Sequence, residues 1–398
     1  MTQTTPITRR IDVDADWQDL AELFSVREDT IYLNHGSFGI APEPVRQARR
    51  RWIDQLDCQP MDFYVRELEP LVANALKKLG QFTGTDASNL VFAENATFAM
   101  NIVASSFPLQ AGDEVLTNNH EYGAVQRIWD RATERAGATN IVARLPDSFE
   151  SHEQIVDCLM GQTSERTRLL VVSHITSPTA LIMPVEAICR EAARRGIAVC
   201  IDGPHAPAHV PLDLERIGCD FYTASCHKWL SASLGSGFLY AHPRHHDQIQ
   251  PPLLSWGRLL PARPERWFEE FIWPGTRDPS CYLSVGPAID FMESVGLETF
   301  RERVRWMTRR TSDQLMDLTG KEPIGKDINL WYGSMAHVPL PDGDWQDLQQ
   351  QLWEQHAIEV PIIDFDDRWY VRVSHHLYTT QEHVSQLLAA LQRAFAAG

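Results

Sequence analysis

The most informative part of the sequence is the stretch Ala198-Val-Cys-Ile-Asp202-Gly-Pro-His205. Its first four residues form a continuous apolar run, which is typical of a strand covered on both faces. One crossover later comes a second stretch that ends in polar residues, Asp220-Phe-Tyr-Thr-Ala-Ser225-Cys-His227-Lys228-Trp229. Because the carboxyl ends of neighbouring parallel strands meet at one rim, we expect Asp202 and Lys228 to lie there together.

Strands and helices alternate on both sides of this pair. The pattern predicts strands at Leu90–Ala93, Glu114–Thr117, Arg168–Ser173, Ala198–Ile201, Phe221–Ala224 and Gly237–Tyr240. It predicts intervening helices that include Thr97–Ser106, Tyr122–Ala136 and Val185–Arg195. Such alternation indicates an α/β fold with a mostly parallel sheet wrapped by helices.

The chain divides into three predicted parts. Residues 1–30 form an N-terminal arm with one short helix, and residues 31–280 form the large domain. The end of the large domain, residues 251–280, is rich in Pro, Trp and Arg and is predicted to be an irregular connection. Residues 281–398 are predicted to form a smaller C-terminal α+β domain that packs with the arm.

Composition narrows the possible functions. The 398 residues carry 36 Lys and Arg against 53 Asp and Glu, a net charge of −17, which argues against nucleic acid or anionic lipid as partner. The sequence has no run of about 18 apolar residues, so no membrane span is predicted. The seven cysteines form no CxxC pair, so we expect no metal site built on cysteine and a reducing, cytoplasmic location.

Asp202 and Lys228 together suggest a specific chemistry. A lysine in a dry pocket can have a lowered pKa and act as an amine nucleophile. An acid that keeps a pyridine nitrogen protonated, beside a Schiff-base lysine, is the pairing that pyridoxal phosphate needs. Taken singly, the lysine could be a solvated surface residue and the aspartate a helix cap. The ordered set of Asp202, His205, Ser225, His227 and Lys228 favours the functional interpretation.

From about residue 30 to residue 380, the chain resembles the class V aminotransferase group of pyridoxal-phosphate enzymes, of fold type I. Within that group it is most similar to the isopenicillin N epimerase-like branch. The motifs that carry the resemblance are Tyr32-Leu-Asn-His-Gly-Ser-Phe-Gly39, Gln59-Pro-Met-Asp-Phe63, Asn95-Ala-Thr97, His120-Glu-Tyr122, Ser173-His-Ile-Thr-Ser177, Asp202-Gly-Pro-His205, Ser225-Cys-His-Lys228-Trp229, Gly275-Thr-Arg-Asp278 and Arg372-Val-Ser374.

The resemblance implies roles around the cofactor ring. Lys228 would form the internal aldimine and carry the proton at Cα, and Asp202 would hold the pyridinium N–H. His205 and Ser177 would lie near the phenolic oxygen O3′, and Tyr122 would stack on the ring. His205 departs from the glutamine that is frequent in the family, and a titratable histidine could tune the aldimine or act as a second base.

A phosphate site is expected at the start of the helix that follows Asn95, Ala96 and Thr97, because free backbone N–H groups and the helix dipole favour an anion. An ordinary helix cap at Thr97 is the structural alternative. By resemblance, Ser225 and His227 would bind further phosphate oxygens. Thr276 would reach the phosphate from the neighbouring subunit, which implies a homodimer.

Arg372, in the strand pattern Trp369-Tyr-Val-Arg-Val-Ser374, suits two-point contact with a substrate carboxylate. A structural salt bridge is the alternative. Asn34 and His35, on a glycine-rich turn, are expected to line the pocket mouth.

The resemblance implies an epimerase or racemase acting at Cα of an amino acid or amino-acid-derived substrate, through an aldimine and a quinonoid. A cysteine or selenocysteine lyase and a class V aminotransferase are the alternatives. No cysteine lies between Cys281 and Arg372, which disfavours a persulfide mechanism, and Cys226 is expected to be a small buried residue. A non-catalytic scaffold predicts a lost lysine, and a nucleotide-binding enzyme predicts a GxGxxG motif after a strand, which is absent.

Overall fold

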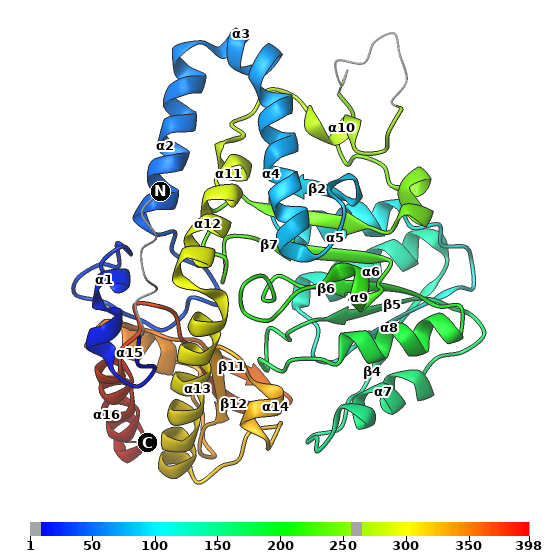
Figure 1. Cartoon of the computed structure of the whole chain (residues 1–398). Helices are drawn as coiled ribbons and strands as arrows, with labels where there is room; N and C mark the ends of the chain where they lie inside the picture. The colour runs from blue at the N-terminus through cyan, green and yellow to red at the C-terminus, as the bar shows by residue number, and fades with distance from the viewer. Residues whose placement is uncertain (1–8, 256–264, 398) are drawn as a thin grey trace.

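The computed structural model describes residues 9–255 and 265–397, and its centre is a seven-stranded sheet (Figure 1). In spatial order the strands are β2 (Leu90–Ala93), β8 (Gly237–Ala241), β7 (Phe221–Ser225), β6 (Ala198–Asp202), β5 (Thr167–Ser173), β3 (Glu114–Asn118) and β4 (Thr139–Ala143). Strands β7, β6, β5, β3 and β4 pair in parallel, and β8 runs antiparallel to both of its neighbours. The mostly parallel α/β sheet is confirmed.

Helices cover the sheet on two faces. Residues of α5 (Ala96–Ser106) and α6 (Gly123–Ala136) pack with Val91, Leu169 and Val171 in one buried cluster. Leu170 and Val172 point the other way and join the cluster that includes residues of α7 (His152–Gly161), α8 (Val185–Arg194) and α9 (Leu214–Ile217). The continuous apolar runs therefore serve two cores, because side chains alternate along a strand.

The predicted strands and helices match these bounds to within about two residues. Strand β4 was not predicted. It lies at the sheet edge, and four of its five residues are at least partly exposed, so it lacks the apolar run that identifies a buried strand.

The C-terminal region forms a second, antiparallel sheet in the order β11 (Ile362–Phe365), β12 (Arg368–Ser374), β9 (Met335–Pro339). This sheet shares a buried cluster with residues of α13 (Leu297–Thr319), α15 (Leu348–His356) and α16 (Gln381–Ala397). The short helix α14 (Ile328–Trp331) precedes β9. Strand β1 (Ile31–Tyr32) pairs in parallel with β10 (Ile358–Glu359), so the start of the predicted large domain lies against the C-terminal region.

The N-terminal arm holds η1 (Asp14–Trp17) and α1 (Gln18–Ala21), and it lies beside α16 (Figure 1). Asp14 forms an ion pair with Arg303 of α13 and accepts a hydrogen bond of 2.8 Å from the Gln381 backbone N–H. The division into domains at residue 280 remains a prediction.

The remaining elements connect the two regions. They are α2 (Glu43–Cys58), α3 (Pro60–Asp62), the π-helical turn η2 (Phe63–Glu67), α4 (Leu68–Thr83), η3 (Ala87–Asn89), η4 (Pro243–Gln248), α10 (Glu269–Ile272), α11 (Ser280–Leu283) and α12 (Val285–Val295). The predicted irregular connection contains α10, and its residues 256–264 lie outside the described part of the chain. No helix in the described part of the chain combines the length and apolar character needed to cross a bilayer.

Candidate active site

A cavity of about 710 Å³ lies at the carboxyl ends of β5, β6 and β7. It is lined by all of the expected cofactor-binding residues except Thr276, namely Asn95, Ala96, Thr97, Tyr122, Ser177, Asp202, His205, Ser225, His227 and Lys228, and also by Arg372. The sheet thus brings together side chains from distant parts of the sequence, because strand ends and helix starts meet at this rim.

Asp202 ends β6 and Lys228 lies in the turn that follows the adjacent parallel strand β7, and both line the same cavity. Asp202 pairs with Thr223 across the β6–β7 ladder and accepts a hydrogen bond of 2.9 Å from its hydroxyl. Burial raises the pKa of Asp202 to about 6, against the opposing effects of Thr223 and of the Lys228 charge. Burial, followed by the charge of Arg372, lowers the pKa of Lys228 to about 7. Burial therefore favours the uncharged amine of Lys228.

His205 contacts Lys228 directly. Its Nε2 lies 3.0 Å from Lys228 Nζ, and its Nδ1 accepts a hydrogen bond of 3.3 Å from Trp229 Nε1. Burial and the neighbouring Lys228 charge hold the pKa of His205 well below its usual value. Burial thus favours the neutral imidazole, which is the form that can accept a proton, and the role of His205 as a second base stays a prediction.

The start of α5 also lines the cavity. The Asn95 side chain accepts a hydrogen bond of 2.9 Å from Phe98 N–H, and Ser225 Oγ accepts one of 3.1 Å from Ala96 N–H. Thr97 is exposed in the cavity. His227 donates from Nδ1 to the Ser236 carbonyl at 3.3 Å. The first turn of α5 with Ser225 and His227 is an arrangement suited to a phosphate group.

Arg372 is a buried cation, only 4% exposed. It donates hydrogen bonds to the Ser177 carbonyl and, at 3.0 Å, to Ser37 Oγ, while its Nε has no hydrogen-bond partner. Within residues 9–255 and 265–397, no acidic side chain forms an ion pair with it, and burial lowers its pKa to about 10. Since an unpaired buried charge is costly, the site is suited to an anionic group of a ligand.

Three expected residues lie elsewhere. His35 is fully buried, with Nδ1 2.8 Å from Tyr378 Oη and Nε2 donating to the Lys228 carbonyl at 3.0 Å. Asn34 donates to Glu359 at 3.1 Å. Thr276 is exposed and is not among the residues that line the cavity of its own chain. The substrate role of Asn34 and His35 and the phosphate role of Thr276 remain predictions.

The cavity also includes residues that were not singled out, namely Gly36, Ser37, Phe38, Val125, Ser173, Ile175, Pro204, Leu234 and Gly235. Behind it, the buried Glu121 accepts hydrogen bonds from Ser173 N–H at 2.9 Å and Ser173 Oγ at 2.6 Å. Burial raises the pKa of Glu121 to about 7. Glu121 occurs inside the quoted motif His120-Glu-Tyr122, but nothing in its local sequence distinguishes a buried glutamate from an exposed one.

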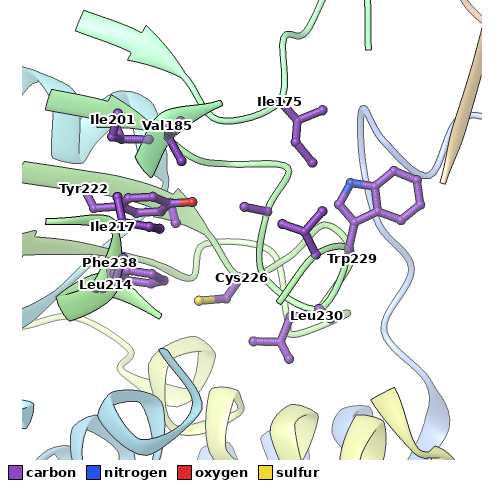
Figure 2. Close-up of a cluster of buried hydrophobic side chains, with 14 of the residues drawn as sticks. Ile175, Val185, Ile201, Leu214, Ile217, Tyr222, Cys226, Trp229, Leu230 and Phe238 are labelled. Carbon is purple, nitrogen blue, oxygen red and sulfur yellow. The ribbon is translucent and has the colours of Figure 1, made fainter. Parts of the chain in front are cut away.

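Cys226 does not line the cavity. Figure 2 shows it among buried apolar side chains, with Leu230 and Phe238 nearby, and burial raises the pKa of its thiol. Cys226 is therefore a small buried core residue, as expected from the sequence.

The model of the family "Aminotransferase class-V" matches residues 64–387. Isopenicillin N epimerase of Streptomyces clavuligerus is 34% identical over 95% of this chain and 98% of its own length. Putative L-cysteine desulfhydrase 1 of Oryza sativa subsp. japonica is 32% identical over 92% of this chain and 83% of its own length. The fold is shared with the cystine C–S lyase C-DES, solved with its product cysteine persulfide, at a TM-score of 0.82 and 21% identity, covering 92% of this chain and 98% of the lyase.

Proposed function

Because the chain belongs to the class V aminotransferases, which are pyridoxal-phosphate enzymes, we propose that it is an epimerase or racemase acting at Cα of an α-amino acid or amino-acid-derived substrate. The observation that carries this proposal is the presence of two groups in one cavity. One is Arg372, a buried cation without an acidic partner in the described chain, and the other is Lys228, an amine with a pKa near 7. The first suits a carboxylate and the second suits proton transfer beside it.

The residues present fit pyridoxal phosphate. The phosphate would be held by the first turn of α5, by Ser225 and His227, and by Thr276 of the partner subunit. Asp202 would hold the ring nitrogen, Tyr122 would cover the ring, and His205 and Ser177 would lie near its phenolic oxygen. When bound, the cofactor supplies an aldehyde for an amine and a protonated ring that withdraws electrons from the substrate.

The protein's own residues orient the substrate and transfer the proton at Cα. Arg372 orients the substrate carboxylate, which fixes the direction of the bonds at Cα. Lys228 Nζ removes the Cα proton and holds it, which requires the uncharged amine that burial favours. Asp202 keeps its charge next to the ring nitrogen, because a bound cation there lowers the pKa of the carboxyl further.

Three observations support epimerisation over the alternatives. The epimerase of Streptomyces clavuligerus covers almost the full length of the chain at 34% identity. No cysteine is found among the described residues that line the cavity, which disfavours a desulfurase that passes sulfur to its own cysteine. Phe38 and Leu234 are apolar, 64% and 55% exposed, and line the same cavity, which suits a side chain larger than that of cysteine.

A cysteine lyase is the second candidate, favoured by the 32% identity to the rice desulfhydrase. Lysine, aspartate and arginine in the same arrangement also serve loss of a β-substituent, because both reactions begin by removing the Cα proton.

Incubation of the cofactor-loaded enzyme with a panel of amino acids in deuterated water separates the two. Deuterium at Cα with inverted configuration, and no pyruvate, ammonia or sulfide, supports the epimerase. Release of those products contradicts it and supports the lyase. The variant Lys228→Ala is the control, since it removes the proton carrier and should show neither outcome.

A further inference from the structure

His205 has two ring nitrogens with different partners. Trp229 Nε1–H points at Nδ1 at 3.3 Å, and an indole nitrogen can only donate. A neutral imidazole carries one proton, so Nδ1 must be the acceptor and Nε2 must carry the hydrogen. The contact of 3.0 Å between Nε2 and Lys228 Nζ then requires Nζ to accept that hydrogen. An ammonium group has no lone pair with which to accept, whereas an amine has one.

We propose that Trp229 is a positioning residue that sets the tautomer of His205, and that the Nε2–H of His205 holds Lys228 as the uncharged amine. This inference deepens the proposed function, because it concerns the lysine assigned there. It explains why a histidine can stand beside the reactive lysine. In the opposite tautomer, Nε2 would accept from an ammonium group and stabilise the unreactive charged form.

Neighbouring histidines supply internal references. His209 Nδ1 lies 3.0 Å from the His205 carbonyl and must donate to it, while His209 Nε2 accepts from Ser334 N–H at 2.6 Å. His209 is therefore the Nδ1–H tautomer, opposite to that of His205. His35 donates from Nε2 to the Lys228 carbonyl, so it should share the tautomer of His205.

The groups that act on this contact come from several elements. Arg372 of β12 and Asp202 of β6 act on Lys228, with opposite effects on its charge. His209 and His227, together with Lys228 and Arg372, act on His205, and all of them disfavour a charged imidazole. A neutral His205 is thus consistent with all of its surroundings.

The test is a nitrogen NMR experiment on the full chain labelled with ¹⁵N-histidine, without added cofactor and then with pyridoxal phosphate. His205 is assigned by comparison with His205→Gln. The expected result in both samples is a neutral ring of His205 with its proton on Nε2, because the Trp229 N–H faces Nδ1, while His209 carries its proton on Nδ1. A proton on Nδ1 of His205, or on both of its nitrogens at pH 7, overturns the proposal.

The second arm compares Trp229→Phe with Trp331→Phe. Both indoles are fully buried, but Trp331 Nε1 has no hydrogen-bond partner. The control variant therefore loses the same side-chain volume as Trp229→Phe without losing a hydrogen bond. In Trp229→Phe we expect a proton on Nδ1 of His205. In the cofactor-free chain, where the Lys228 amine is free, we also expect acylation of Lys228 at pH 7, followed by peptide mass spectrometry, to slow roughly fivefold, as for a rise of about one pKa unit. Trp331→Phe should leave both readouts unchanged.

An unchanged tautomer in Trp229→Phe contradicts the role of the indole. If that variant does not fold, 3-benzothienylalanine at position 229 removes the N–H and keeps the ring size. Neither readout depends on turnover, so failure of the proposed reaction and failure of this inference are distinguishable.

Discussion

Arg372 lies on β12 with its guanidinium buried and its Nε without a hydrogen-bond partner. We expect Arg372→Lys to raise KM for an amino-acid substrate about 10- to 100-fold with a smaller change in kcat, because a charge-assisted hydrogen bond contributes about 1.5–3 kcal/mol. Steady-state kinetics measure the change. Arg368→Lys, at an exposed position of the same strand, is the control. An unchanged KM for Arg372→Lys would show that Arg372 does not bind the substrate carboxylate.

We expect Glu121 to make the stability of the fold depend on pH. Burial raises its pKa from 4.5 to about 7, so the folded chain binds a proton more tightly there than the unfolded chain does. The stability contribution of Glu121 is complete below about pH 4.5 and is lost as the pH rises to 7. Glu121→Gln keeps the shape without the charge. The free energy of unfolding of Glu121→Gln, relative to that of wild type, should therefore rise by about 3 kcal/mol between pH 4.5 and pH 7. This corresponds to about 1.4 kcal/mol per pKa unit.

Urea unfolding of the full chain at several pH values measures this difference. Glu134→Gln, at an exposed position of α6, the helix that begins two residues after Glu121, controls for loss of a surface charge. A difference between Glu121→Gln and wild type that stays constant with pH would show that Glu121 does not titrate in the folded protein.

At the scale of elements, the proposed phosphate site at the first turn of α5 depends on how closely β8 approaches that helix. A Cβ added at Gly237 would lie 2.4 Å from the Ala224 carbonyl oxygen and 2.8 Å from Asn95 Cα. Backbone atoms on both sides cannot move aside without moving β7 or the start of α5. We therefore expect Gly237→Ala to cost about 1–3 kcal/mol of stability and to weaken cofactor binding.

Absorbance titration with pyridoxal phosphate measures the apparent Kd, beside the thermal midpoint. Gly161→Ala is the matched control, because a Cβ there meets nothing within 4 Å. If Gly237→Ala lowers the midpoint and leaves the Kd unchanged, the start of α5 does not contact the phosphate.

At the scale of the whole molecule, the proposal requires two chains for each complete site. Thr276 is exposed and is not among the residues lining its own cavity. Thr276→Ala should therefore weaken cofactor binding, and Lys228→Ala should abolish activity. A mixed dimer of these two variants would contain one intact site, formed by Lys228 of one chain and Thr276 of the partner subunit.

Co-expression of the two variants with different tags, followed by tandem purification, provides this species. Recovered activity is the expected result, and its absence would place Thr276 outside the neighbouring site.

Much of this architecture follows from patterns among adjacent residues. Apolar runs such as Ala198–Ile201 predicted the strands, and the polar residues after them predicted that Asp202 and Lys228 would meet at one rim. These inferences succeed because burial of a strand and the direction of its end are properties of a short segment. The edge strand β4 escaped the same reasoning, since its residues lack the apolar signal.

Protonation and pairing depended instead on contacts across the fold. Arg372 has no acidic partner in the described chain because β12 carries it to Ser37 and Ser177, far away in the sequence. Burial favours the neutral form of His205, and the Trp229 indole N–H, which faces Nδ1 within the core, leaves Nε2 to carry the proton in the tautomer that we propose. His35 is buried and donates to the Lys228 carbonyl, and it is not among the residues that line the cavity. A residue's charge state reflects its dielectric surroundings and its partners, and only the folded chain assembles these.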